Sequence, residues 1–316
     1  MLQLRVTCPT ELTAAVIEVF SGGPAVSQLA VHRGASISPA GDIVVADVAR
    51  EGADDLVERL RALGIPESGT IHIQPVATWL SDAGLRAERR VPGAGADAVV
   101  WAEVTQRAYE DSQLNWIYLA FMTLATLLAS VAIVIDSQIL VIGAMVLGPE
   151  FITIAALGLA LVRRRRRLFV SAARTLVVGF AVAIVIATLA GLVARALGWV
   201  TKADVTGARS GTSFIYSPDK WSFIVAVIAA VAGVLSLTSA KVGGLSGVFI
   251  SVTTVPAAGN VALGLAFGAR GEILGSAAQL ALNVSGMILA GWLTLATQQA
   301  VRKRIDRYRH RVAEGS

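Results

Sequence analysis

The hydrophobic positions of this chain follow two patterns, which change between residues 78 and 113. Before residue 78, apolar residues alternate with polar ones or recur every three to four positions, as in strands and amphipathic helices. From about residue 113, the apolar runs are long enough to cross a lipid bilayer as helices, which takes about 20 residues each. Six such runs follow one another: 115–135, 138–162, 168–196, 221–240, 245–268 and 273–298. The pattern predicts a soluble N-terminal domain followed by an α-helical polytopic membrane domain with six spans.

Residues 1–80 are predicted to form an α+β domain with the element order βαββαβ. The expected strands are 2–7, 26–32, 42–48 and 70–76, and the expected helices are 11–20 and 53–63. This order is that of the ferredoxin-like fold, in which a βαβ unit is split by a further strand. Residues 81–112 are predicted to be a connector with short helices, broken by the proline and glycines of 92–95.

The membrane domain, residues 113–300, contains an internal repeat. Trp116 and Trp221 open the first run of each copy, 105 positions apart, and Pro149 and Pro256 interrupt the second runs, 107 positions apart. The two copies are 113–196 and 219–298. Because each copy has three runs, the second must enter the bilayer from the opposite side. A 3+3 inverted repeat with a proline-broken second helix in each copy is typical of secondary transporters.

Charge divides the 316-residue chain in the same way. The first 112 residues hold 9 Lys and Arg against 15 Asp and Glu, whereas the rest holds 18 against 7. The arginine turn, residues 163–167, and the basic cytoplasmic tail, residues 301–316, are both assigned to the inner side by the positive-inside rule. We therefore expect a protein of the bacterial inner (cell) membrane with both termini in the cytoplasm. The positive charge lies at the borders of the spans, so the expected partner is the lipid bilayer and not a nucleic acid.

Glu150 is the most informative single residue, because it follows Gly148 and Pro149 in the middle of the second span. A carboxylate at such a depth costs about 2–3 kcal/mol even on the lenient insertion scale, so it should face protein or water. Pro149 donates no backbone hydrogen bond and disfavours helix at Gly148, which frees carbonyl groups for an ion or a ligand. The alternative is a structural kink with Glu150 bonded to a neighbouring helix. Arg174, roughly 10 Å into the third span, is the expected partner of Glu150, in a structural ion pair or in a gating or substrate-binding pair.

The second broken span places hydroxyl groups before Pro256 and an amide after it. Thr253, Thr254 and Asn260 could bind a cation or a small anion together with unwound backbone. Alternatively, the threonine hydroxyls bond to the carbonyls of their own helix. Asn283 in the sixth span is a further candidate of the same kind.

The sequence gives little support for enzymatic chemistry. Its single cysteine, Cys8, excludes an intrachain disulfide and a thiolate metal cluster. None of the three histidines lies within a span or at the spacing of a metal site, and no nucleophile elbow, phosphate loop or zinc-protease motif is present. No catalytic residue, metal or cofactor is expected.

Two segments resemble a known family of bacterial membrane proteins. They are the string from Asp136 to Glu150, which contains Gly-Ala-Met-Val-Leu-Gly-Pro-Glu and is followed by the arginine turn, and the string Thr253-Thr-Val-Pro-Ala-Ala-Gly-Asn260. The chain is similar to the proteins catalogued as domain of unknown function 389, and its N-terminal part looks like the soluble domain of their actinobacterial members. The resemblance implies a membrane domain joined to a soluble domain, with transport suspected from the architecture. It implies no particular binding residue.

Three functions fit these observations. The favoured one is a secondary transporter or permease for a small polar or anionic solute, with Glu150 as the group that couples to protons or cations. An ion channel could be built on the same broken helices, and single-channel steps would distinguish it. A membrane sensor would bind a metabolite through its N-terminal domain. An exposed edge of the N-terminal sheet would favour a homo-oligomer.

Overall fold

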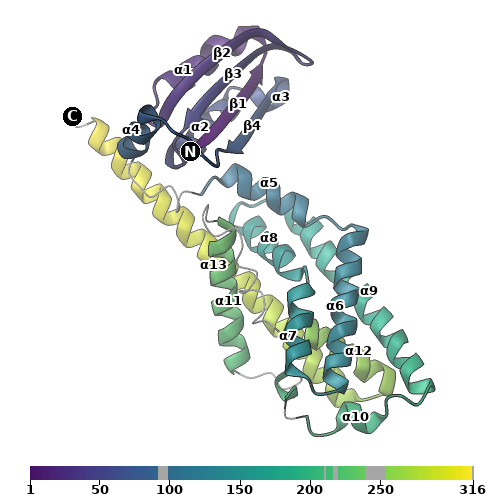
Figure 1. Ribbon diagram of the computed structural model, residues 1–316. Coiled ribbons are helices and arrows are strands. Elements are labelled where there is room, and N and C mark those ends of the chain that lie inside the picture. Colours follow the sequence, from purple (N-terminus) through teal and green to yellow (C-terminus); the bar gives the residue numbers. More distant parts are fainter. Residues whose placement is uncertain (92–98, 210, 216–219, 239–252, 315–316) are drawn as a thin grey trace. The chain divides into compact units, whose positions relative to one another are not determined.

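The computed structural model describes residues 1–91, 99–209, 211–215, 220–238 and 253–314, with side chains as far as Val301 (Figure 1). The chain divides into two compact units, with the first boundary after Gln106. The predicted breaker at 92–95 and the first part of the predicted fifth span lie outside the described residues.

The first unit is built on a four-stranded antiparallel sheet. Its strands are β1 (Leu2–Cys8), β2 (Val26–Ile37), β3 (Ala40–Val48) and β4 (Thr70–Pro75), in the order β2-β3-β1-β4. The helical elements are η1 (Thr10–Leu12), α1 (Thr13–Ser21), α2 (Arg50–Ala62) and α3 (Ile65–Ser68). The strands and main helices follow the predicted order, and the β2–β3 hairpin is longer than predicted.

One face of this sheet is covered by helices. Along β1 the residues alternate, so that Leu4 and Val6 are fully buried while Arg5 between them is exposed. Leu4 and Val6 pack in one cluster with Phe20 of α1 and Leu60 of α2. The period of two in β1 and of three to four in the helices thus produces a single apolar core. The connector adds α4 (Asp82–Arg90) and α5 (Trp101–Asp111).

The second unit is helical. In chain order its elements are α6 (Trp116–Val134), α7 (Gln138–Leu147), α8 (Glu150–Val162), α9 (Arg166–Ala196), α10 (Lys202–Thr206), η2 (Ser213–Ile215), α11 (Lys220–Thr238), α12 (Thr254–Phe267) and α13 (Arg270–Glu314). Within the described residues, four helices are long and apolar enough to cross a membrane, or five if α7 and α8 count as one bent span. The six predicted spans are therefore not all tested.

The predicted break in the second span is present. α7 ends at Leu147, α8 begins at Glu150, and the two helices are bent by 52°. Pro149 is the residue before α8, where its missing N–H group removes no helical hydrogen bond. Pro256 occupies the third position of α12, so in the described residues it lies in the first turn of a helix and does not interrupt one.

α13 is longer than predicted. The sixth span was expected to end near residue 298 and to be followed by a separate tail, but the helix continues to Glu314. The reason is compositional, because no glycine or proline lies between Trp292 and Glu314 and most of the residues there favour helix.

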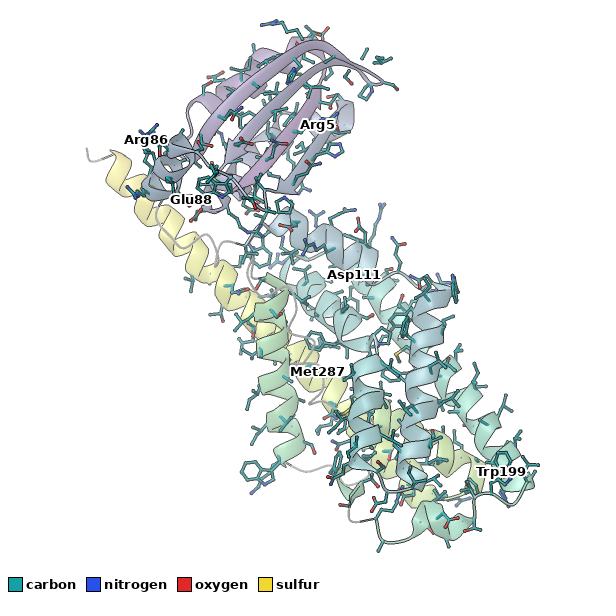
Figure 2. All side chains as sticks on the ribbon, viewed as in Figure 1. Arg5, Arg86, Glu88, Asp111, Trp199 and Met287 are labelled. Atoms are coloured by element: carbon teal, nitrogen blue, oxygen red, sulfur yellow. The ribbon has the colours of Figure 1, made fainter. Side chains whose placement is uncertain are left out.

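The helices expose large apolar side chains to their surroundings. Ile139 and Val177, for example, are 83% and 67% exposed. Trp116 and Trp199 lie exposed at helix ends, the second labelled in Figure 2, as expected for residues at a membrane–water interface. This surface is compatible with a multi-pass membrane protein.

Candidate binding site in the helical domain

The carboxyl group of Glu150 lies buried where α8 begins. Only 5% of the residue is exposed, although it sits in the first turn of its helix. Its Oε1 accepts a hydrogen bond of 2.6 Å from the hydroxyl of Thr254, the first residue of α12. Its Oε2 has no hydrogen-bond partner among the described residues. The second oxygen of a buried carboxyl group is thus open to a proton, a cation or a donor.

Thr253, next to Thr254, connects the Glu150–Thr254 pair to buried residues of α13. Its hydroxyl oxygen accepts hydrogen bonds from the side-chain amides of Gln279, at 3.3 Å, and Asn283, at 2.9 Å. Both amide residues are almost completely buried. We refer to Glu150, Thr253, Thr254, Gln279 and Asn283 as the Glu150 cluster.

Three side-chain oxygens of the Glu150 cluster are hydrogen-bond acceptors that have no donor in the part of the chain that the structure describes. Within the described residues, Glu150 Oε2, Gln279 Oε1 and Asn283 Oδ1 are all buried without a hydrogen bond. An orphaned buried acceptor costs about 1–3 kcal/mol, so a ligand that bonded to these three atoms would recover that cost. Carboxyl and amide oxygens are ligands that hard cations prefer. The arrangement can therefore bind a proton, a monovalent cation or a solute with N–H or O–H groups.

Gly148 allows the two half-helices to approach each other at this point. A β-carbon at position 148 would collide with Oε2 of Glu150 and lie 2.7 Å from the side chain of Val255 in α12. The N-termini of both α8 and α12 lie at the cluster. Because each N-terminus carries a partial positive charge, the pair favours negative charge on Glu150 by about 0.3–1 kcal/mol per helix when exposed and more in a dry site.

The prediction that Arg174 pairs with Glu150 is wrong. Arg174 is exposed, and no ion pair joins it to any carboxylate of the described chain. The physical reason is its position around α9. The next residue, Thr175, points inward and donates a 2.8 Å hydrogen bond to the Ser112 carbonyl, so Arg174, about 100° away around the helix, points outward.

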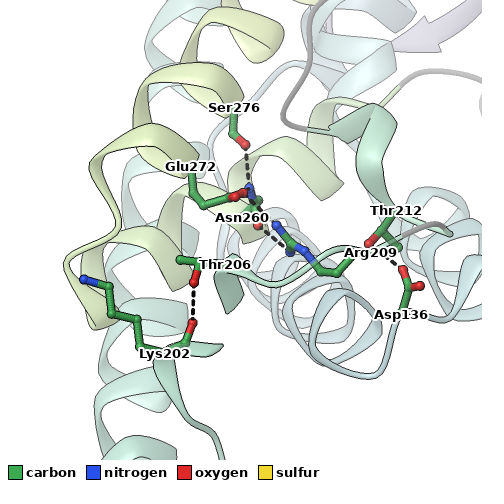
Figure 3. Close-up of polar contacts among 8 residues, drawn as sticks. All are labelled: Asp136, Lys202, Thr206, Arg209, Thr212, Asn260, Glu272 and Ser276. Atoms are coloured by element: carbon green, nitrogen blue, oxygen red, sulfur yellow. Dashed lines mark hydrogen bonds and ion pairs between the residues drawn. The ribbon is translucent and has the colours of Figure 1, made fainter. Parts of the chain in front are cut away.

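Asn260 belongs to a second polar cluster and not to the Glu150 cluster. Its amide group donates hydrogen bonds of 2.7 Å to Glu272 and 2.8 Å to Ser276, as Figure 3 shows. Its oxygen accepts one of 3.2 Å from Arg209, which also forms a 2.7 Å ion pair with Glu272. We call Arg209, Asn260, Glu272 and Ser276 the Arg209 cluster. Asn260 lies about 9 Å along α12 from Thr254, too far for the two side chains to belong to one site.

The sequence analysis did not identify the Arg209 cluster. Arg209 lies between the predicted third and fourth spans, and Glu272 directly precedes the predicted sixth span, 273–298. The available signal was an acid one position before the predicted start of the sixth apolar run, and its partner lies 63 residues earlier in the chain.

The segment that carries Arg209 is fixed at a second point. Asp136, between α6 and α7, accepts hydrogen bonds from the Gly211 amide at 3.1 Å and the Thr212 hydroxyl at 2.8 Å. These donors, with the Gly211 amide as the larger cause, hold the pKa of Asp136 below its usual value. The segment between α10 and η2 is therefore held to two parts of the helical unit and is not a free loop.

Within the described residues, no group of three His, Cys, Asp or Glu side chains is arranged to hold a metal ion. The Glu150 cluster has a single carboxylate among neutral oxygens. Such a ligand set matches a proton or a singly charged ion better than a transition metal.

The long apolar helices, together with a small antiparallel sheet domain, are compatible with a multi-pass membrane protein that carries an N-terminal α+β domain. Residues 145–289 match the family model described as "Domain of unknown function (DUF389)". The matched segment contains both polar clusters. Neither the curated proteins nor the solved structures contain a match to this chain.

Proposed function

We propose that the protein is a secondary transporter for a small polar solute, driven by a proton or a monovalent cation that binds at Glu150. The observation that carries this proposal is the Glu150 cluster, where a buried carboxyl group with one unbonded oxygen lies at the N-termini of two half-helices. Intramembrane acids usually mark ion or substrate pathways, and broken helices are where transporters bind their ions.

The packing of the helical unit supports a repeat with two equivalent halves. α8 packs against α13 of the second half, and α12 packs against α9 of the first half. Each half-helix also packs on the long helix that follows it in the chain. This reciprocal packing supports the proposal of a 3+3 inverted repeat. Placement in the cell membrane with both termini in the cytoplasm, and a ferredoxin-like N-terminal domain, remain part of the proposal from the sequence. Rocking of the halves would alternate access to the cluster.

The chemistry of the cluster narrows the solute class. Its unbonded atoms within the described residues are acceptors, and Arg174, the one cation expected beside it, faces away. The cluster therefore favours a solute that carries hydrogen-bond donors over a purely anionic one.

The test is transport by the full-length protein in liposomes under an imposed pH gradient. Amino acids, sugars and small organic acids are applied in turn, and charge movement is recorded on a solid-supported membrane. Wild type should give pH-driven currents with at least one solute, and Glu150→Gln should give none while remaining folded. Asp204→Asn is the matched control, because Asp204 is an exposed carboxylate in α10 of the same unit. Normal pH coupling in Glu150→Gln would refute the assignment, and steady single-channel steps would replace the carrier by a channel.

A further inference from the structure

A pocket lies at the beginning of α9, and neither polar cluster contributes to its lining. It has a volume of about 810 Å³ and is lined by Gln113, Leu114, Arg166, Arg167, Val170, Ser171, Arg174 and Thr175. The Thr175–Ser112 hydrogen bond holds the segment with Gln113 and Leu114 against α9, so the two walls of the pocket are tied together. We call it the arginine pocket.

Three positive charges converge on this pocket without a counter-charge. Arg166, Arg167 and Arg174 are exposed, and none forms an ion pair with a carboxylate of the described residues. Arg167 and Arg174 lie on one side of α9, because a spacing of seven is close to two helical turns. A guanidinium group binds the oxygens of a phosphate in a planar, bidentate geometry.

The helix itself adds donors for an anion. α9 begins after Arg165, and no side chain caps its first turn. The N–H groups of that turn and the helix dipole favour a phosphate at the same end of the pocket. Ser171 contributes a hydroxyl group to the lining.

Leu114 and Val170 give the pocket an apolar side next to the exposed apolar surface of α9. Val170 is 57% exposed within the pocket, and Val177, two turns further along α9, is also largely exposed. Arg174 lies roughly 10 Å along the helix from Arg167, where its apolar stem can follow this surface toward the interface. A soluble phosphate would use the arginines but not the apolar side, whereas a phospholipid would use both.

We propose that the arginine pocket binds the phosphate headgroup of an anionic phospholipid, with the acyl chains against Val170 and the exposed surface of α9. The arginine turn then acts as a lipid-binding site in addition to setting the orientation of the chain. This inference does not depend on the function of the Glu150 cluster.

The test uses full-length protein in a neutral detergent, titrated with phosphatidylglycerol, phosphatidylcholine or glycerol 3-phosphate. Native mass spectrometry counts the bound lipid, and the shift in melting temperature gives the affinity. Wild type should bind phosphatidylglycerol at least about tenfold more tightly than phosphatidylcholine. Arg174→Gln should lose about tenfold in affinity for phosphatidylglycerol.

Arg164→Gln is the matched control, because it removes the same charge from the arginine turn beside the pocket, at a position that does not line the pocket. It should retain the wild-type affinity, and its melting temperature without lipid shows whether loss of an arginine affects folding. Equal binding of both lipids, equal losses in the two variants, or equally tight binding of glycerol 3-phosphate would each overturn the inference.

Discussion

Removal of the guanidinium group of Arg209 should destabilise the helical unit strongly. Arg209→Met leaves the Glu272 carboxylate with the Asn260 amide as its remaining bond in the Arg209 cluster, and it leaves the Asn260 oxygen without its 3.2 Å donor. The side chains of Arg209 and Glu272 are only 4% and 12% exposed, so water can replace little of the lost interaction.

The size of the effect follows from these contacts. Breaking a buried ion pair on one side usually costs about 3–5 kcal/mol, because the remaining charge stays buried. Glu272 keeps the Asn260 bond and lies in the first turn of α13, where the helix dipole stabilises it by about 0.3–1 kcal/mol. We therefore expect Arg209→Met to reduce the free energy of unfolding by about 2–4 kcal/mol. The double variant with Glu272→Met should lose less than the sum of the single variants, because no unpaired charge remains.

The assay is unfolding of the full-length protein by sodium dodecyl sulfate in mixed micelles, followed by tryptophan fluorescence. Lys202→Met is the control, since it removes an exposed cation nearby (Figure 3) and should change the stability by less than about 0.5 kcal/mol. A loss below about 1 kcal/mol for Arg209→Met, or strict additivity in the double variant, would refute the buried-pair reasoning.

Two further predictions concern other parts of the chain. Gly148→Ala should destabilise the protein by about 1–3 kcal/mol in the same assay, because its β-carbon would collide with Glu150. Gly143→Ala, inside α7, should be neutral or stabilising, since the nearest atom to its β-carbon is 3.9 Å away; equal effects of the two changes would contradict the close approach. In the N-terminal unit, hydrogen bonds from the Gly34 amide and the Thr13 hydroxyl, both 2.8 Å, lower the pKa of Asp42. The folded form thus binds this proton less readily than the unfolded form, so stability is complete above the unfolded pKa and is lost as the pH falls through the folded one. Hydrogen exchange of the β2–β3 hairpin should accelerate below about pH 4 relative to the intrinsic rate, and Asp42→Asn should remove most of this pH dependence; an unchanged pH profile in Asp42→Asn would exclude Asp42 as the cause.

The features that the sequence predicted well are those with a local cause. The alternation in β1 predicted a sheet with one buried face, and Pro149 predicted the bend between α7 and α8. The sequence also identified Glu150, Thr253 and Thr254 as polar residues inside an apolar unit, and the structure brings them together with Asn283.

The features that the sequence did not predict depend on the rotation of helices about their axes and on pairing between residues far apart in the chain. Arg174 and Gln279 occupy matching positions in the two copies, yet Arg174 is exposed and Gln279 is fully buried. The rotation of each helix about its axis is set by its neighbours, which composition does not reveal. The pairing of Arg209 with Glu272 likewise depends on how a segment between two helices folds back, and no periodic pattern encodes it.

α12 has a mechanical consequence, because it is a single short helix held at three levels. Thr254 at its first residue bonds to Glu150, Asn260 in its middle bonds to Arg209, and Arg195 donates a 3.0 Å hydrogen bond to the Ala266 carbonyl near its end. Because α12 has only about four turns, we expect a shift of the helix at one of these bonds to displace the other two as well. A displacement of α12 caused by binding of an ion at Glu150 would then also release the Arg209–Glu272 pair, although Glu150 and that pair are not in contact.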